Sequence, residues 1–289
     1  MASLGTNKAY LDYSLEELDG ALDQQKYAPN WRDLLAVYKN QSAAARARLR
    51  PGVFQYGATA AETLDVYPVP ASRETPIMIF LHGGGWRMMS REDVAYAAPM
   101  FVAAGIAFVA PGYSLLPMAS FAEMAAQCRR AVAWVHQNAW LIGGSAKRIY
   151  VGGLSAGAQL SGVLAATDWT DHRLPADVIR GALLVSGIYD LAALAASTAY
   201  SYTKLTRAEI EALSPMRHIR NIHCPISLAW GEKEPPEFAR QSRAFAAALA
   251  REQRPHRTLI AAGKSHFEIA LDLADRDTAL GRFAVEGVQ

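Results

Sequence analysis

The sequence has little that would indicate a disulfide framework, a metal site or a nucleic-acid partner. Its 289 residues include two cysteines, Cys128 and Cys224, which are too few for a disulfide network and match no metal-site spacing. The formal net charge is only +2, which excludes a strong field attracting nucleic acid or an anionic membrane. We interpret Arg46, Arg48 and Arg50 as a solvated helix face.

Long apolar runs are also missing. The most apolar stretch, residues 97–112, is interrupted by Gly105 and Pro111 and is too short to cross a membrane. The N-terminal residues lack the apolar core of a signal peptide. We therefore expect a cytoplasmic protein with no membrane partner, no metal and no cofactor. The sequence does not determine the oligomeric state, and a homodimer is one alternative.

What the chain does have is enough apolar material for a large core. Hydrophobic residues make up 51% of the sequence and charged residues 19%, as in ordinary globular proteins. A length of 289 residues lies within the range of one large α/β unit. The sequence therefore predicts a single domain over residues 1–289.

The order of apolar patterns predicts the architecture. Residues 1–50 are predicted to be helical, with a capping-box pattern at Ser14 and Glu17 and a stop at Pro51 and Gly52. Short apolar runs then alternate with helical segments, and the predicted strands are residues 63–69, 76–82, 106–113, 148–153, 182–188, 226–231 and 257–263. This alternation indicates a mostly parallel sheet covered by helices. Residues 191–219 carry no strand pattern and, with residues 1–50, are predicted to form a small helical cap.

Two glycine-rich segments follow predicted strands. The first is "FLHGGGW" (80–86), and the second is "GLSAG" (153–157), which fits the pattern G-x-S-x-G. In such a turn the serine backbone is strained, and glycines on both sides let strand and helix approach closely. The helix that begins directly after Ser155 points its N-terminal dipole at the serine, which favours developing negative charge there.

The pairing of "HGGGW" with "GLSAG" resembles the α/β-hydrolase superfamily, in its branch of esterases and lipases with an HGG-type loop. The segments "YSLLPMASFAEMAAQCRRAVAWVHQNA", "SGIYDL" and "GEKEPPEFARQS" are similar to the arylformamidase (kynurenine formamidase) group and its bacterial esterase relatives. The likeness extends over most of the chain from about residue 50 onward. It implies the α/β-hydrolase fold and serine hydrolase chemistry.

A serine nucleophile needs a histidine base and an acid that orients it, in the chain order serine, acid, histidine. His266 follows a late predicted strand and its loop, so we predict that it is the base for Ser155. The acid should follow the strand at 226–231. Three glutamates lie there, and the resemblance indicates Glu234, where the family usually carries aspartate; the other carboxylates considered are Glu232, Glu237 and Asp190. Asp190 is alternatively a helix N-cap.

Backbone donors complete the predicted site. Attack by Ser155 creates an oxyanion, for which we predict N–H donors from Ala156, Gly83 and Gly84. The arylformamidase group generally carries a tyrosine where this chain has Gly85, which predicts a different pocket wall. We expect Gly85 and Trp86 to contact the substrate. Four further residues could line the pocket or pack in the core, namely Met88, Met89, Tyr200 and Tyr202, and Trp31 could do the same from the N-terminal helices.

These residues predict a metal-independent serine hydrolase that cleaves a small aryl formamide or acylamide through an acyl-serine intermediate. Aryl amines leave more easily than alkyl amines, which agrees with the arylformamidase resemblance. A carboxylesterase for short acyl esters is the runner-up, since both bonds suit the same mechanism. A third alternative is a ligand-binding module that has lost catalysis, which the presence of both Ser155 and His266 disfavours.

Overall fold

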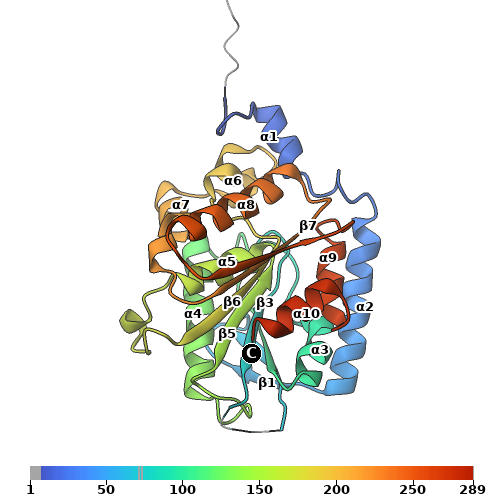
Figure 1. Cartoon of the computed structure of the whole chain (residues 1–289), viewed down its shortest axis with the longest axis vertical. Helices are drawn as coiled ribbons and strands as arrows, with labels where there is room; N and C mark the ends of the chain where they lie inside the picture. The colour runs from blue at the N-terminus through green and yellow to red at the C-terminus, as the bar shows by residue number, and fades with distance from the viewer. Residues whose placement is uncertain (1–7, 71, 73, 289) are drawn as a thin grey trace, which may run out of the picture.

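The computed structural model describes residues 8–70, 72 and 74–288 (Figure 1). The strands are β1 (Gly52–Gln55), β2 (Thr63–Tyr67), β3 (Ile77–Leu81), β4 (Ala107–Pro111), β5 (Ile149–Leu154), β6 (Ile179–Val185), β7 (Ile226–Gly231) and β8 (His256–Ala261). The α-helices are α1 (Leu15–Leu22), α2 (Trp31–Leu49), α3 (Ala98–Ala103), α4 (Phe121–Gln137), α5 (Ala156–Ala165), α6 (Ala192–Ala196), α7 (Arg207–Leu213), α8 (Pro236–Arg251), α9 (Glu268–Leu271) and α10 (Ala279–Glu286). Short 3₁₀ helices are η1 (Arg91–Ala97), η2 (Trp169–His172), η3 (Ser201–Thr203), η4 (Pro215–Asn221) and η5 (Asp272–Ala274).

Within the described residues the strands form one sheet of eight, in the order β1-β2-β4-β3-β5-β6-β7-β8. β2 is antiparallel to both β1 and β4, and every other pairing is parallel. The expectation of a mostly parallel sheet is therefore confirmed. Because the carboxyl ends of parallel strands share one edge, the segments that follow β3, β5, β6, β7 and β8 meet there.

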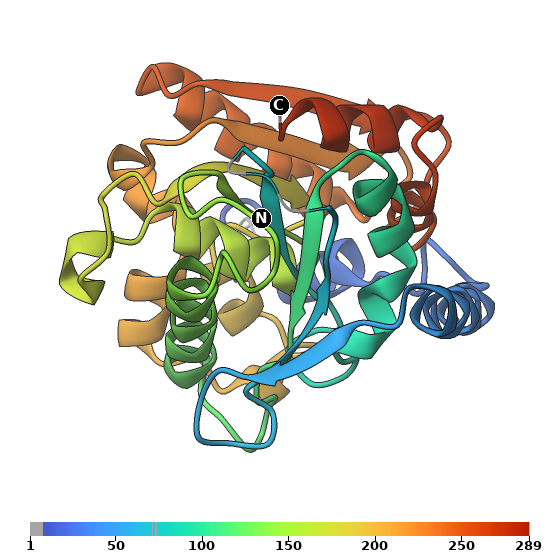
Figure 2. The same cartoon turned by 90° about the horizontal axis from the view of Figure 1, so that it is seen from below.

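Both faces of the sheet are buried, which explains the unbroken apolar runs. In β3, Ile77, Ile79 and Leu81 belong to the core beneath α4, α5 and α8. Met78 and Phe80 alternate with them and belong to the core beneath α3 and α10 on the opposite face. Figure 2 shows these two helical layers, with α2 outside α3 and packed on η1.

Most predicted elements appear close to their predicted bounds, and β7 coincides with residues 226–231. β6 is shifted toward the N-terminus relative to the predicted 182–188, because Ile179 already pairs with β5 and the chain turns at Ser186. β1 was not predicted; it is a short edge strand whose side chains are only partly buried.

In the N-terminal segment the predicted helices are α1 and α2, joined by turns, and residues 1–7 of that prediction lie outside the described residues. Ser14 and Glu17 form the capping box of α1, and α2 ends at Leu49 before the left-handed Arg50. Between Leu191 and Ile219 lie only helices and turns. None of the helices in the described part of the chain is both long and apolar enough to cross a bilayer.

One interpretation of the basic cluster is wrong. Arg48 and Arg50 are exposed, but Arg46 reaches back to the fully buried carboxylate of Asp65, which also accepts from Arg91 at 3.0 Å. A carboxylate on a buried strand needs such partners to stay charged. Arg46 therefore ties α2 to β2 instead of facing only solvent.

Candidate active site

Ser155 occupies a sharp turn between β5 and α5. Its backbone has φ 57° and ψ −117°, a conformation that L-residues rarely adopt, and its N–H donates to the carbonyl of Val185 at 2.9 Å. The side chain is 8% exposed. The turn therefore lifts the hydroxyl of Ser155 above the end of the sheet, at the N-terminus of α5.

The two glycines of this turn are required by space. A Cβ at Gly153 would lie 2.4 Å from the carbonyl carbon of Gly157. A Cβ at Gly157 would lie 2.1 Å from the carbonyl oxygen of Leu81. The pattern G-x-S-x-G thus reflects direct contact between strand β5, helix α5 and the end of β3.

The glycine loop after β3 lies against the same serine. A Cβ at Gly83 would be 3.3 Å from the Cβ of Ser155, so Gly83 directly borders the side chain of Ser155. Gly84 has φ 102°, and a Cβ there would lie 2.1 Å from the carbonyl oxygen of Met88. Gly83 and Gly84 lie outside the helices and strands. Among the described residues, their backbone N–H groups donate to no backbone carbonyl. Their N–H groups, with that of Ala156 at the first turn of α5, are candidates to bind an oxyanion.

His82 holds this loop from behind. Its ring stacks on Tyr113 with centroids 4.2 Å apart, and its Nδ1–H donates to the carbonyl of Gly83 at 2.8 Å. The hydroxyl of Tyr113 donates to the carbonyl of His82 at 2.6 Å. Burial lowers the pKa of His82 from 6.5 to about 4, so the ring is neutral at physiological pH. His82 therefore supports the loop and does not face the reacting atoms.

His266 and Glu234 are brought together from two loops. Nδ1 of His266 is 2.8 Å from Oε2 of Glu234, and both side chains are almost fully buried. Because a carboxylate can only accept, Nδ1 carries the proton and Nε2 is left with its lone pair. The ring of Phe238 packs edge-on against His266 at 4.8 Å between centroids. In this tautomer Nε2 carries a lone pair and can accept a proton, as a base must.

The other carboxylates considered for this role are engaged elsewhere. Asp190 accepts from the N–H of Ala192 at 3.0 Å and from Arg217 at 3.4 Å. Glu237 is fully buried and pairs with Arg240 at 2.6 Å. Glu232 is exposed and accepts from the N–H of Gly263 at 2.7 Å. Of the four candidates, Glu234 is the one that contacts His266.

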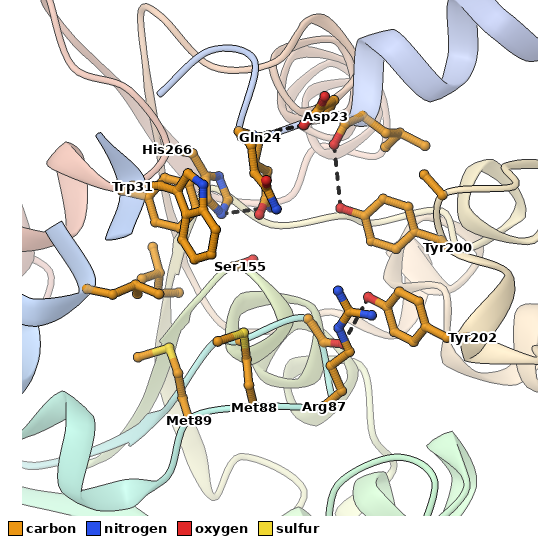
Figure 3. A pocket seen from close by; sticks show the side chains of 18 of the residues that line it. Asp23, Gln24, Trp31, Arg87, Met88, Met89, Ser155, Tyr200, Tyr202 and His266 are labelled. Atoms are coloured by element: carbon orange, nitrogen blue, oxygen red, sulfur yellow. Dashed lines mark hydrogen bonds between the residues drawn. The ribbon is translucent and has the colours of Figure 1, made fainter. Parts of the chain in front are cut away.

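A cavity of about 420 Å³ opens above Ser155 (Figure 3). His266 and Phe267 line it, and so do Met88 and Met89 from the loop after β3. The N-terminal segment and the 191–219 segment contribute another part of the wall, which includes Asp23, Gln24, Trp31, Tyr200 and Tyr202. The two segments are joined directly, because Asp19 accepts from the N–H of Thr198 at 2.9 Å and from the hydroxyls of Ser197 and Thr198.

Trp86 does not line this cavity, which corrects the expectation that it contacts the substrate. Its side chain is 2% exposed, packs against Phe121 and donates from Nε1 to Gln159 at 3.0 Å. Positive φ angles at Gly84, Gly85 and Trp86 redirect the chain at this point. As a result Trp86 enters the core, and Arg87, which was not predicted, lines the cavity.

Gly85 forms part of the wall together with Tyr202. A Cβ at Gly85 would lie 3.0 Å from the hydroxyl oxygen of Tyr202, which donates to the Gly85 carbonyl at 3.1 Å. The guanidinium of Arg87 lies 4.1 Å above the ring of Tyr202. A side chain from the 191–219 segment thus occupies the space that a side chain at position 85 would need.

Gln24 is another residue of the site without a signal in the sequence. It lies in the loop between α1 and α2, and its side-chain nitrogen is 3.0 Å from Nε2 of His266 (Figure 3). The two residues are 242 positions apart, and no motif surrounds Gln24. Only the folded chain brings this amide to the histidine.

The elbow, the glycine loop and the buried histidine–carboxylate pair at the end of a parallel sheet define an α/β-hydrolase. A family model described as alpha/beta hydrolase fold matches residues 78–222, and the chain belongs to this family. The matched region contains the glycine loop and Ser155 and ends before Glu234 and His266. Hydrolase activity follows from this membership and from the relatives below.

Among curated proteins, the chain is 34% identical to the kynurenine formamidase of Salmo salar over 229 residues, which is 77% of this chain and 76% of that protein. It is 27% identical to the esterase LipQ of Mycobacterium tuberculosis over 269 residues, covering 77% of this chain and 62% of that protein. Among solved structures, a putative thioesterase from Silicibacter sp. TM1040 superposes with a TM-score of 0.80 at 23% identity, covering 94% of this chain and 98% of that one. The structural match agrees with the fold.

Proposed function

We propose that the protein is a serine hydrolase that cleaves a small aryl formamide or acylamide, with Ser155 as nucleophile. His266 Nε2 takes the proton of the Ser155 hydroxyl as its oxygen attacks the carbonyl carbon. The N–H groups of Gly83, Gly84 and Ala156 stabilise the resulting oxyanion. His266 then gives the proton to the leaving nitrogen, and the C–N bond breaks to leave an acyl-serine. Water, deprotonated by His266, hydrolyses this ester and releases the carboxylic acid and free Ser155.

The observation that carries this proposal is the hydrogen bond of 2.8 Å between His266 and Glu234 beside the cavity that contains Ser155. The carboxylate fixes the tautomer in which Nε2 is the base, and it stabilises the imidazolium that forms during attack. The strained turn at Ser155 is the conformation such a nucleophile requires. A ligand-binding module would not need both the His266–Glu234 pair and the strained turn at Ser155. Their presence together therefore favours a catalytic role.

An aromatic substrate with an acidic group suits the cavity best. Its wall includes the aromatic side chains of Trp31, Tyr200 and Tyr202, and its volume suits a small molecule. Arg87 offers guanidinium N–H groups, and Asp23 lies at the opposite end of the cavity (Figure 3). The kynurenine formamidase relative supports an N-formyl aryl amine as the scissile group.

A carboxylesterase acting on short acyl esters is the second candidate. The esterase relative supports it, and the same groups would hydrolyse an ester, whose alkoxide leaves with less help from His266.

We further propose that residues 1–50 and 191–219 act as a cap on a single domain, supported by the contacts of Asp19 with Ser197 and Thr198. A cytoplasmic location is consistent with two buried cysteines that form no disulfide.

The test has two parts. A fluorophosphonate should label wild-type protein at Ser155, and the Ser155→Ala variant should not be labelled. Unlabelled protein from a preparation that reacts with the fluorophosphonate is then assayed on N-formyl aryl amines, with and without a carboxylate, and on p-nitrophenyl esters. Faster turnover of the formamides supports the proposal, and faster turnover of the esters supports the alternative. Absence of labelling in folded wild type would overturn both. Glu234→Gln should abolish most turnover, and Asp190→Asn is the matched control.

A further inference from the structure

Ser186 has an unusual backbone at the point where β6 ends. Its φ is 55°, it is fully buried, and its N–H donates to the carbonyl of Ala229 at 2.8 Å. For a residue with a Cβ this left-handed conformation is unfavourable and persists only where the surroundings impose it. Glycine would adopt it without strain. The serine side chain therefore needs an explanation beyond the turn itself.

The hydroxyl of Ser186 supplies that explanation, because it donates to Oε1 of Glu234. The same oxygen accepts from the N–H of Gly231 at 3.3 Å. The other oxygen, Oε2, receives Nδ1–H of His266 at 2.8 Å. The two carboxylate oxygens thus have separate partners, one set on the sheet and one on the histidine.

This division matters because the acid is a glutamate. Compared with aspartate, glutamate has one more rotatable bond between backbone and carboxylate, so its carboxylate has more orientations available. A single bond to His266 would leave those orientations largely open. Two donors on Oε1, from the ends of β6 and β7, restrict them to the one in which Oε2 faces the imidazole.

We propose that Ser186 is a positioning residue for catalysis, whose hydroxyl holds Glu234 so that Oε2 orients His266. The inference rests on the proposed function, because it assigns Glu234 and His266 their roles. Ser186 does not touch the substrate in this proposal. It acts only through the carboxylate, and its effect on the reaction should vanish when that carboxylate is absent.

Two substitutions separate this role from a merely structural one. Both Ser186→Ala and Ser186→Gly remove the hydroxyl, but only glycine also removes the strain at φ 55°. We expect both variants to label with fluorophosphonate at Ser155 about tenfold more slowly than wild type, as befits a lost hydrogen bond to a charged group. The melting temperature should be higher for Ser186→Gly than for Ser186→Ala. The low-field proton resonance of His266 Nδ1–H should move upfield in both.

The outcomes are distinct. If labelling follows the melting temperature, so that Ser186→Gly reacts like wild type, Ser186 has only a structural role and the inference is overturned. Adding Ser186→Ala to a Glu234→Gln protein should change the labelling rate less than twofold; a further tenfold loss would also overturn it. If wild-type protein is not labelled at all, the proposed function fails instead. Labelling therefore tells the two failures apart without knowledge of the natural substrate.

Discussion

Gln24 should slow the chemistry of Ser155 in the resting protein. Its amide N–H donates to Nε2 of His266 at 3.0 Å, since the proton of that ring is on Nδ1 and directed at Glu234. The hydroxyl of Ser155 must use the same Nε2 lone pair to be activated. Under the proposed mechanism the two donors compete, so we expect Gln24 to leave before attack.

The expected size of the effect follows from the ordinary strength of a neutral hydrogen bond. A neutral hydrogen bond in a protein contributes about 0.5–1.5 kcal/mol net. Removing this competing contact should therefore raise the reactivity of Ser155 by about 2- to 12-fold. Gln24→Met keeps the length of the side chain and removes the donor. Gln25→Met is the matched control, because Gln25 lines the same cavity without a side-chain bond to His266.

The assay is the second-order rate of labelling by a small fluorophosphonate, measured beside the melting temperature of each protein. A small reagent is chosen because it depends little on the rest of the pocket. The expected order is Gln24→Met faster than wild type, with Gln25→Met equal to wild type. Equal or slower labelling of Gln24→Met at an unchanged melting temperature would refute the competition, and would mean that Gln24 is neutral or assists the reaction.

Two further predictions concern the glycine loop. Gly84→Ala forces a Cβ to within 2.1 Å of the Met88 carbonyl and should lower kcat about 100-fold or more by displacing an oxyanion donor, whereas Gly105→Ala, with positive φ but open space, should leave kcat unchanged. The pKa of His82 is lowered from 6.5 to about 4 in the folded protein. Between these two pH values the unfolded chain binds a proton at His82 and the folded protein does not. Stability should fall as the pH drops from 6.5 to 4, by at most about 1.4 kcal/mol per pH unit from this group, and denaturant titrations of His82→Asn should lack that component.

The parts of the site that could be predicted from sequence are those governed by local constraints. The spacing of Gly153, Ser155 and Gly157 follows from one turn in which strand and helix touch, and the pattern is visible in five residues. β7 coincides with the predicted residues 226–231, a mostly apolar run that Pro225 precedes and Gly231 ends. In such cases the signal lies within a few consecutive residues, even though Gly157 also meets the Leu81 carbonyl at the end of β3.

The parts that could not be predicted depend on contacts between distant segments. The sequence near Trp86 suggests a pocket residue, but three successive positive φ angles turn it into the core and bring Arg87 to the cavity. Gln24 reaches His266 from the loop between α1, which packs against α8, and α2, whose Trp31 stacks on Phe267. Arg46 lies in a basic run and yet pairs with a buried carboxylate on β2. Neither periodicity nor motif encodes these partners.

The wall at Gly85 combines both kinds of information. Gly85 can be read from the sequence, but the reason for its missing side chain cannot. The space that a side chain at position 85 would need is occupied by the hydroxyl of Tyr202, more than a hundred residues away in the chain. Two contacts hold Tyr202 in place. Its hydroxyl donates to the Gly85 carbonyl, and the guanidinium of Arg87 lies over its ring. This side of the cavity is therefore formed by the loop after β3 and the 191–219 segment as one unit. Under the proposed function we expect a change in either segment to alter selectivity, while Ser155, Glu234 and His266, which follow β5, β7 and β8, keep their geometry.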